Sequence, residues 1–189
     1  MPAPLRENKK KSQSSKKGRP KVYLDPIDYV PRVFIEFEDV LIDMGNESVG
    51  MSKDELLDMP GVVLSLLPKK DAVAGIKALL NAGCNIWITT KISNKNQGAV
   101  SEKIHWLQQY TPWLANRLII TPEKGILGNS EDYLIAQKNT NISFAGFTIT
   151  QGKNAFLNDW TATVSYLNDK LNLDLKTDFR NGSIINLNY

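Results

Sequence analysis

Short apolar runs alternate with longer amphipathic segments along most of this sequence, and this alternation limits the architectures that it can adopt. In the segment 69–83, for example, Val73 and Ile76 lie on one helical face. Ser52 and Glu55 have the spacing of a capping box and indicate the start of another helix. Apolar strands separated by helices favour a mostly parallel sheet that is covered on both faces. The predicted fold class is therefore α/β, with a doubly wound, mostly parallel sheet. The predicted strands are 30–37, 85–90, 117–121, 133–136 and 142–149, and the predicted helices lie around 51–59, 69–83, 99–110 and 158–171.

Charge divides the chain into a basic tail and a mildly acidic body. Residues 1–22 contain eight Lys or Arg and one Glu, a net charge of +7 within a total of +3, so the rest of the chain carries −4. The tail has almost no large apolar side chains with which to offset its ordering entropy, so we expect it to be disordered. The α/β domain is expected over 23–175, with a short, reduced cap insert at about 44–69 and a C-terminal extension at 176–189.

Both ends of the chain suggest contacts with other molecules. The tail segment KKGRPK (16–21) resembles the Arg-Gly-Arg-Pro core of an AT-hook, which enters the minor groove of A·T-rich DNA. We expect the tail to bind nucleic acid, DNA or RNA, because its cations would displace counterions from phosphates. A solubilising linker and a nuclear-import signal are the alternatives. At the other end, Asn181 and Gly182 suit the turn of an edge hairpin, and docking on another chain is the alternative. The nucleic-acid-binding residues predicted in the tail are Lys9, Lys10, Lys11, Lys16, Lys17, Arg19 and Lys21.

Hydropathy argues against a membrane protein. No apolar run approaches the roughly 18 residues of a membrane span, and the N-terminus is too basic and too polar for a signal peptide. We therefore expect no membrane contact and a cytoplasmic location, with the nucleus or nucleoid as alternatives because of the basic tail.

Acidic, hydroxyl and lysine side chains follow the predicted strands. The carboxyl ends of parallel strands meet at one edge of a sheet, which is where α/β folds bind their ligands. Acids and a lysine at one edge suit a phosphate and a divalent cation, but the fourth strand ends without a charged residue. Glu131 and Asp132 precede that strand and should lie at its opposite end. The residues expected at the ligand-binding edge are Glu36, Glu38, Asp39, Thr90, Lys124, Ala136 and Gln137.

The order of the segments resembles the haloacid dehalogenase (HAD) superfamily of phosphatases, and within it the 5'(3')-deoxyribonucleotidase branch. The resemblance covers roughly residues 32–167. Six pieces occur in the order of the family, and together they imply a Rossmann-like fold and phosphate chemistry. These pieces are MPGVVLSLLPKKDAVAGIKAL, IWITT, SEKIHWLQQY, LIITPEK, EDYLIAQK and NDWTATVSYL.

The resemblance also implies which residues would do the chemistry. Family members use an aspartate nucleophile, a second aspartate as acid and base, and Mg²⁺ held partly by two further aspartates. Glu36 and Glu38 stand at the first two positions, and each carries one extra methylene. A misplacement of about 1 Å can cost about 10²-fold in rate. Asp39 replaces a glycine, which we expect to forbid a positive φ there.

The fourth motif has lost the carboxylates that the family uses for its metal. Ala136 and Gln137 stand in their places, so no Mg²⁺ site and no cofactor are predicted. The resemblance still implies phosphate contact through Thr90 and Lys124.

Three functions follow from these observations. The favoured hypothesis is a pseudo-phosphatase that serves binding or assembly, with a protein partner on its body and nucleic acid on its tail. The second is an active Mg²⁺-dependent 5'(3')-deoxyribonucleotidase that uses Glu36 and Glu38. The third is a structural component of a nucleoprotein complex.

Overall fold

A computed structural model describes most of the chain outside its two ends. It covers residues 29–45, 50–93, 95–137, 143–152, 157, 159–175, 177–178 and 185–186. The basic tail and its predicted nucleic-acid-binding residues lie outside the described residues, as does the Asn181-Gly182 pair.

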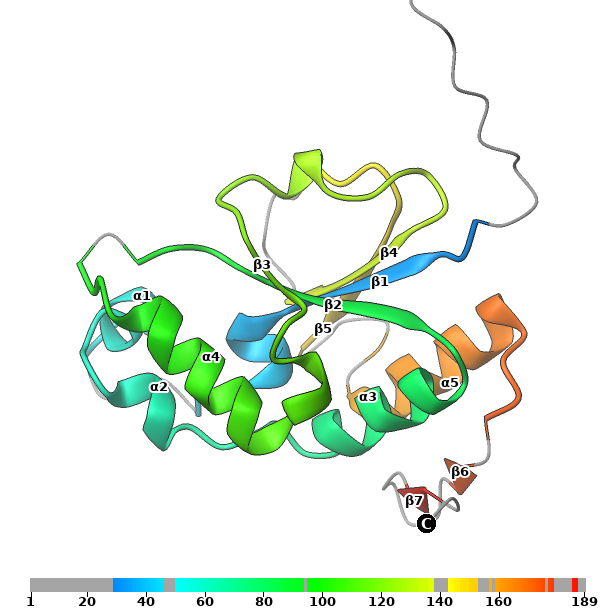
Figure 1. Cartoon of the computed structure of the whole chain (residues 1–189), viewed down its shortest axis with the longest axis horizontal. Helices are drawn as coiled ribbons and strands as arrows, with labels where there is room; N and C mark the ends of the chain where they lie inside the picture. Colours follow the sequence, from blue (N-terminus) through cyan, green and yellow to red (C-terminus); the bar gives the residue numbers. More distant parts are fainter. Residues whose placement is uncertain are drawn as a thin grey trace, which may run out of the picture.

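A five-stranded parallel sheet forms the centre of the molecule (Figure 1). The strands lie in the order β3-β2-β1-β4-β5, and each neighbouring pair is parallel. The chain moves outward from β1 to β3 and then returns to β4, so the strand order reverses between β1 and β4. The predicted doubly wound α/β fold is therefore confirmed. The strands are β1 (Arg32–Glu36), β2 (Asn85–Thr90), β3 (Leu118–Ile120), β4 (Tyr133–Gln137) and β5 (Phe147–Gln151).

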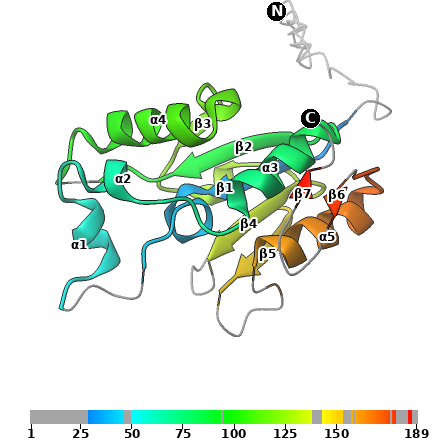
Figure 2. The same ribbon diagram turned by 90° about the horizontal axis from the view of Figure 1, so that it is seen from below.

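The helices lie on one face of this sheet (Figures 1 and 2). On the other face, the described residues form loops and one short 3-10 turn, Lys124–Ile126 (η4). The β3–β4 connection contains Pro122, Gly125 and Gly128, which disfavour a longer helix. Both faces of the sheet are covered, as predicted, but loops cover one face and helices cover the other (Figure 1). The helices are α1 (Lys53–Leu57), α2 (Val62–Ser65), α3 (Ala72–Asn81), α4 (Ala99–Tyr110) and α5 (Trp160–Leu171).

Two predicted elements differ in detail from the structure. The strand expected at 142–149 is β5, which begins only at Phe147, because the preceding residues pass close to the β4 side of the sheet. A side chain at Gly146 would collide with the carbonyl oxygen of Asp132. The helix predicted at 51–59 is the shorter α1, and its predicted capping box is confirmed.

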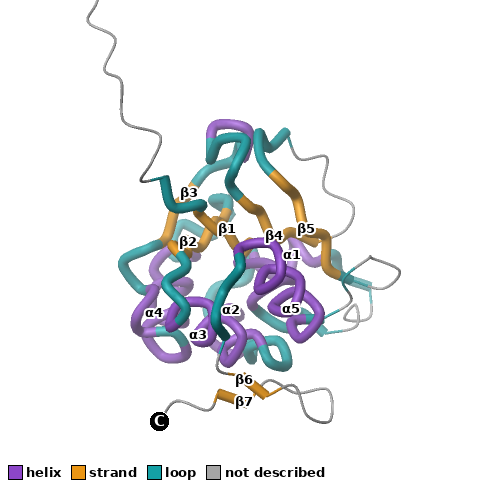
Figure 3. The backbone as a smooth tube through the Cα atoms, turned by 90° about the vertical axis from the view of Figure 1, so that its right-hand side faces the viewer, coloured by secondary structure: helices purple, strands orange, loops and turns teal. Residues whose placement is uncertain are grey.

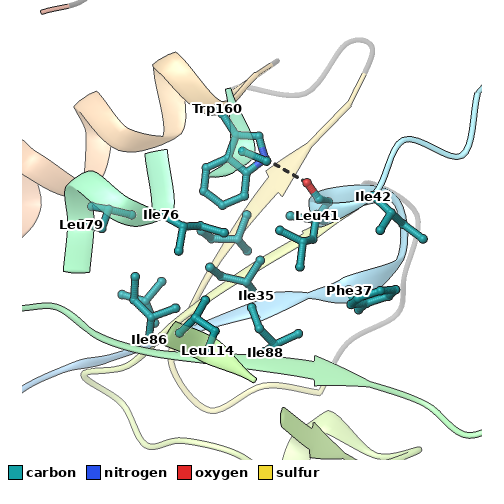
Figure 4. Packing of buried hydrophobic residues seen from close by; sticks show 14 of the residues in the cluster. Ile35, Phe37, Leu41, Ile42, Ile76, Leu79, Ile86, Ile88, Leu114 and Trp160 are labelled. Carbon is teal, nitrogen blue, oxygen red and sulfur yellow. Dashed lines mark hydrogen bonds between the residues drawn. The ribbon is translucent and has the colours of Figure 1, made fainter. Parts of the chain in front are cut away.

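The main core lies between the sheet and the helices (Figure 4). Ile35 and Ile88 of the central strands pack toward Ile76 of α3, and all three are fully buried. Complete burial of one such side chain contributes about 1.5–3 kcal/mol. Trp160 of α5 joins this core and donates from Nε1 to the carbonyl oxygen of Val40, at 2.9 Å. Since Val40 follows β1, the C-terminal helix helps to position the turn that leaves the central strand.

The C-terminal extension forms an antiparallel pair of short strands, β6 (Thr177–Asp178) and β7 (Ile185–Asn186). This pair is separate from the main sheet and lies beyond the helices (Figure 3). The two strands pair with each other, whereas the Asn181-Gly182 turn expected between them lies outside the described residues. Among the helices of the described ranges, none combines the length and the apolar character that a membrane crossing requires.

Candidate functional site

A cleft of about 450 Å³ opens at the carboxyl ends of β1 and β4, where the strand order reverses. This is the position at which open α/β sheets bind ligands. A second hollow of about 210 Å³ adjoins it, and the two share Glu38, Asp54, Leu57 and Lys91 in their walls. The cleft is lined by Glu36, Glu38, Asp39, Ser52, Lys53, Asp54, Leu57, Lys91, Lys124 and Gln137.

Glu36 is the last residue of β1, and only 4% of it is exposed. One carboxylate oxygen forms an ion pair with Nζ of Lys124. The other accepts a hydrogen bond from the backbone N–H of Gln137, at 2.9 Å. Both oxygens of the predicted nucleophile position therefore have partners within the protein.

Lys124 reaches Glu36 from η4, on the loop face of the sheet. Burial lowers the pKa of Lys124 from 10.5 to about 8, because the ammonium loses hydration. The adjacent Glu36 carboxylate acts in the opposite direction, since a negative neighbour favours the charged amine. The predicted phosphate-binding lysine is thus at the cleft, but its contact is a carboxylate of the same chain.

Glu38 turns toward β2 and α4. Its Oε1 accepts hydrogen bonds from the hydroxyl of Thr90 and from Nζ of Lys103, the latter at 2.7 Å. Lys103 is only 3% exposed and also donates to Thr90 Oγ1 at 2.8 Å and to the carbonyl oxygen of Lys91 at 3.2 Å. An ammonium has three N–H donors, so these contacts use all of them.

Asp39 follows in the turn Phe37–Leu41 (η2), with φ 59° and ψ −8°. The expectation that an aspartate forbids a positive φ here is wrong. Aspartate tolerates the left-handed region better than most residues, because its short side chain can form local hydrogen bonds. Its carboxylate pairs with Lys53 of α1 at 2.7 Å, and its carbonyl oxygen accepts from Nζ of Lys69. The turn therefore keeps the left-handed backbone and adds a paired charge.

Helix α1 and the residue that ends it are tied to the rest of the cleft by two further ion pairs. Asp54 pairs with Lys91 at 2.9 Å, and Asp58 pairs with Lys95 at 3.7 Å. Every carboxylate that lines the two hollows is consequently paired with its own lysine. The five pairs are Glu36–Lys124, Glu38–Lys103, Asp39–Lys53, Asp54–Lys91 and Asp58–Lys95.

Lys103 is the main site residue that sequence reasoning missed. The helical spacing of Val100, Ile104 and Leu107 predicts an apolar face, but Val100 and Ile104 are only partly buried. The buried positions are Ala99, Lys103, Trp106 and Leu107. The sequence does contain a signal for this burial, because Lys103 has the helical spacing of the apolar residues Ala99, Trp106 and Leu107.

The donor set at the cleft does not fit a Mg²⁺ ion. Ala136 is fully buried at the end of β4 and offers no ligand, and Gln137 contributes its N–H to Glu36. Within the described ranges, no three His, Cys, Asp or Glu residues are grouped so that they could hold a metal ion. Mg²⁺ is held largely by carboxylate oxygens, whereas each carboxylate of the cleft has one oxygen paired with a lysine.

Asp132 lies at the opposite end of β4, as predicted. It is fully buried and forms an ion pair with Arg32 at 2.7 Å, and the Tyr29 hydroxyl donates to the same carboxylate. Burial tends to raise the pKa of Asp132, but the hydrogen bonds from Arg32 and Tyr29 outweigh it and hold the pKa below its ordinary value. This cluster anchors the start of β1 and does not belong to the cleft.

The fold and the cleft define a class of protein: a parallel α/β protein with a charge-lined crevice at the point where the strand order reverses. Neither models of known protein families nor curated protein sequences gave a match. Among solved structures, the fold is similar to the crystal structure of a HAD family hydrolase from Deinococcus radiodurans R1 with bound phosphate and sodium. The identity is 14%, the TM-score is 0.45, and the match covers 73% of this chain and 88% of that chain. These values are too low to assign a family, and the fold class rests on the strand order itself.

Proposed function

We propose that this protein is a catalytically degenerate member of the HAD phosphatase superfamily, which binds or assembles with other molecules and does not hydrolyse phosphate esters. The observation that carries the proposal is the pairing of all five carboxylates that line the two hollows with lysines. The order of the sequence motifs supports the superfamily. Within the superfamily, these motifs favour the branch of 5'(3')-deoxyribonucleotidases.

The state of Glu36 argues against nucleophilic catalysis. A carboxylate nucleophile needs an oxygen that is free to attack phosphorus. One oxygen of Glu36 is held by Lys124 and the other by the Gln137 N–H, in a position that is almost fully buried. Attack by Glu36 would first have to break such contacts.

The end of β4 argues against metal-assisted catalysis. The developing charge of phosphoryl transfer is normally neutralised by a metal ion and positioned cations. The side chain of Ala136 cannot coordinate a metal, and the side chain of Gln137 carries no charge. The chain thus lacks two acids at the strand end that would complete a metal site with Glu36.

One assay tests this proposal. Purified protein is incubated with deoxynucleoside monophosphates and Mg²⁺, and phosphate release is compared with that of Glu36→Gln and of Asp54→Asn, which alters a cleft acid outside the first motif. We expect all three proteins to release phosphate at the same background rate. Mg²⁺-dependent release that Glu36→Gln abolishes and Asp54→Asn retains would overturn the proposal.

The alternative is an active phosphatase that uses Glu36 and Glu38. The convergence of Thr90, Lys103 and Lys124 on these two glutamates favours it, because hydroxyls and lysines are also the groups that hold a phosphate. The same assay decides between the two functions.

We also propose that the basic tail contacts nucleic acid, either in a nucleoprotein complex or as a tether for the folded body. Its net charge of +7 supports this role. Tyr29, the first described residue, precedes β1 and contacts Asp132, so the described part of the chain begins at the end of the sheet opposite the cleft. Deleting residues 1–21 tests the proposal through nucleic-acid binding.

A further inference from the structure

The side chain of Glu38 lies where a bound anion would have the best donors in the cleft. Its Oε1 accepts from the Thr90 hydroxyl and from Nζ of Lys103. Both donors come from rigid elements, since Thr90 ends β2 and Lys103 lies within α4. Thr90 is fully buried and Lys103 nearly so. These two donors are therefore fixed in place and largely shielded from water.

The charge balance here depends on Glu38. If its carboxylate were removed, Lys103 would keep only the neutral oxygens of Thr90 and Lys91 as partners. A buried ammonium without a counter-charge is strongly unfavourable. The vacated position would then attract an external anion.

We propose that Glu38 is a built-in ligand that blocks an oxyanion site formed by Thr90 and Lys103, and that the external ligand of this site is a phosphate group that displaces the Glu38 carboxylate. This inference rests on the proposed function, because an active enzyme would use Glu38 as an acid and base instead. The extra methylene of Glu38 helps its carboxylate to reach Thr90 and Lys103, and an aspartate would be less able to do so.

The surroundings of Glu38 allow such a displacement. The hollow of about 210 Å³ beside it is several times the volume of a water molecule, about 30 Å³. Its wall also contains Lys91 and Lys95, whose ammonium groups each have three N–H donors and add positive charge for a multiply charged group. Glutamate has a flexible side chain, so its carboxylate can leave the pair through rotamer changes while the backbone stays in place. The blocked state is thus reversible.

Inorganic phosphate is the probe for this site. Binding is measured by calorimetry and by thermal unfolding for the full-length protein and for Glu38→Ala, with chloride at equal ionic strength as the reference. We expect Glu38→Ala to bind phosphate at least about tenfold more tightly than the parent, a difference of about 1.4 kcal/mol. Its melting temperature should rise with phosphate and not with chloride.

Two variants serve as matched controls. Asp54→Ala also removes a cleft acid from a lysine pair, but Lys91 is 56% exposed, so water replaces the lost partner and no gain in phosphate affinity is expected. The double variant Glu38→Ala/Lys103→Met removes both charges of the buried pair and should lose the gain. An equal gain in Asp54→Ala, or a gain that survives in the double variant, would show that phosphate binds elsewhere.

A further variant covers the case in which Glu38→Ala does not fold. Glu38→Gln keeps the shape of the side chain without its charge, and we expect it to gain less affinity than Glu38→Ala but more than the parent. Phosphate affinity equal to that of the parent in every folded Glu38 variant would overturn the inference. That result would leave the proposed lack of phosphatase activity intact, since it is measured separately as Mg²⁺-dependent turnover.

Discussion

Asp39 combines a backbone requirement with a charge requirement in one residue. Its φ of 59° lies in the left-handed region, and its carboxylate reaches Lys53 across the cleft. The left-handed conformation costs most residues roughly 1–2 kcal/mol, whereas glycine adopts it without this cost. Substitutions at Asp39 can therefore separate the effect of backbone strain from the effect of losing the carboxylate.

Substituting Asp39 by Gly and by Ala removes the same carboxylate but changes the backbone cost. We expect Asp39→Ala to be less stable than Asp39→Gly by about 1 kcal/mol, because alanine bears the left-handed strain and glycine does not. Urea unfolding gives the two free energies of unfolding. Equal stabilities would contradict the strain argument, and Asp39→Asn, which tolerates this conformation, provides the control for loss of charge alone.

The strands and helices differ in how far the sequence predicts them. The buried strands β1, β2 and β4 were located correctly, because their apolar runs are bounded by polar residues. The start of β5 was misplaced, because Phe144 and Ala145 lie in a loop that Gly146 fits against Asp132. Local pattern cannot reveal such a long-range contact.

The candidate site was predicted only in part, because the contacts that complete it also depend on tertiary packing. The strand ends placed Glu36, Glu38 and Lys124 at one edge, because parallel strands share their direction. The pairing of each acid with a lysine could not be predicted, since Lys53 and Lys103 come from helices whose orientation depends on tertiary packing. In α4, two candidate apolar faces differ by one residue, and only the packed structure selects the face that buries Lys103.

Helix α5 supports the cleft through Trp160. The indole N–H donates to the carbonyl oxygen of Val40, next to the Asp39 turn, and the ring is almost fully buried (Figure 4). Trp160→Phe would remove this donor and some packing volume, so the free energy of unfolding should fall by about 2–4 kcal/mol.

The matched control for Trp160→Phe is the same change at an exposed tryptophan. Trp113 is 41% exposed, and phenylalanine would keep an aromatic ring near Lys77. Trp113→Phe should change stability by less than about 0.5 kcal/mol. A loss of the same size in both variants, measured by denaturant unfolding, would argue that the bond to Val40 contributes nothing.

Across the whole chain, charge is divided between a basic tail and an acidic body. The cleft at the carboxyl ends balances its acids with lysines, whereas residues 1–22 carry a net charge of +7. The chain outside the tail carries −4, so that part of the molecule has little overall attraction for a polyanion. Nucleic-acid binding should therefore depend on the tail.

Deletion of residues 1–21 should abolish salt-dependent binding to duplex DNA or RNA. The tail holds eight Lys or Arg, and each phosphate neutralised on B-DNA contributes about −0.9 to the slope of log K against log salt. Engagement of about half of these cations predicts a slope near −4 for the parent and a slope near zero for the truncated protein.

The control for this deletion is a full-length variant in which Lys9, Lys10, Lys11, Lys16 and Lys17 become Gln, which keeps the length of the tail and removes most of its charge. Both altered proteins should lose binding together if charge is the cause. Binding by the truncated protein with an unchanged slope would place the nucleic-acid contact on the body instead. The lysines of the cleft would then be the first residues to test, because they are cations that the described structure gathers in one place.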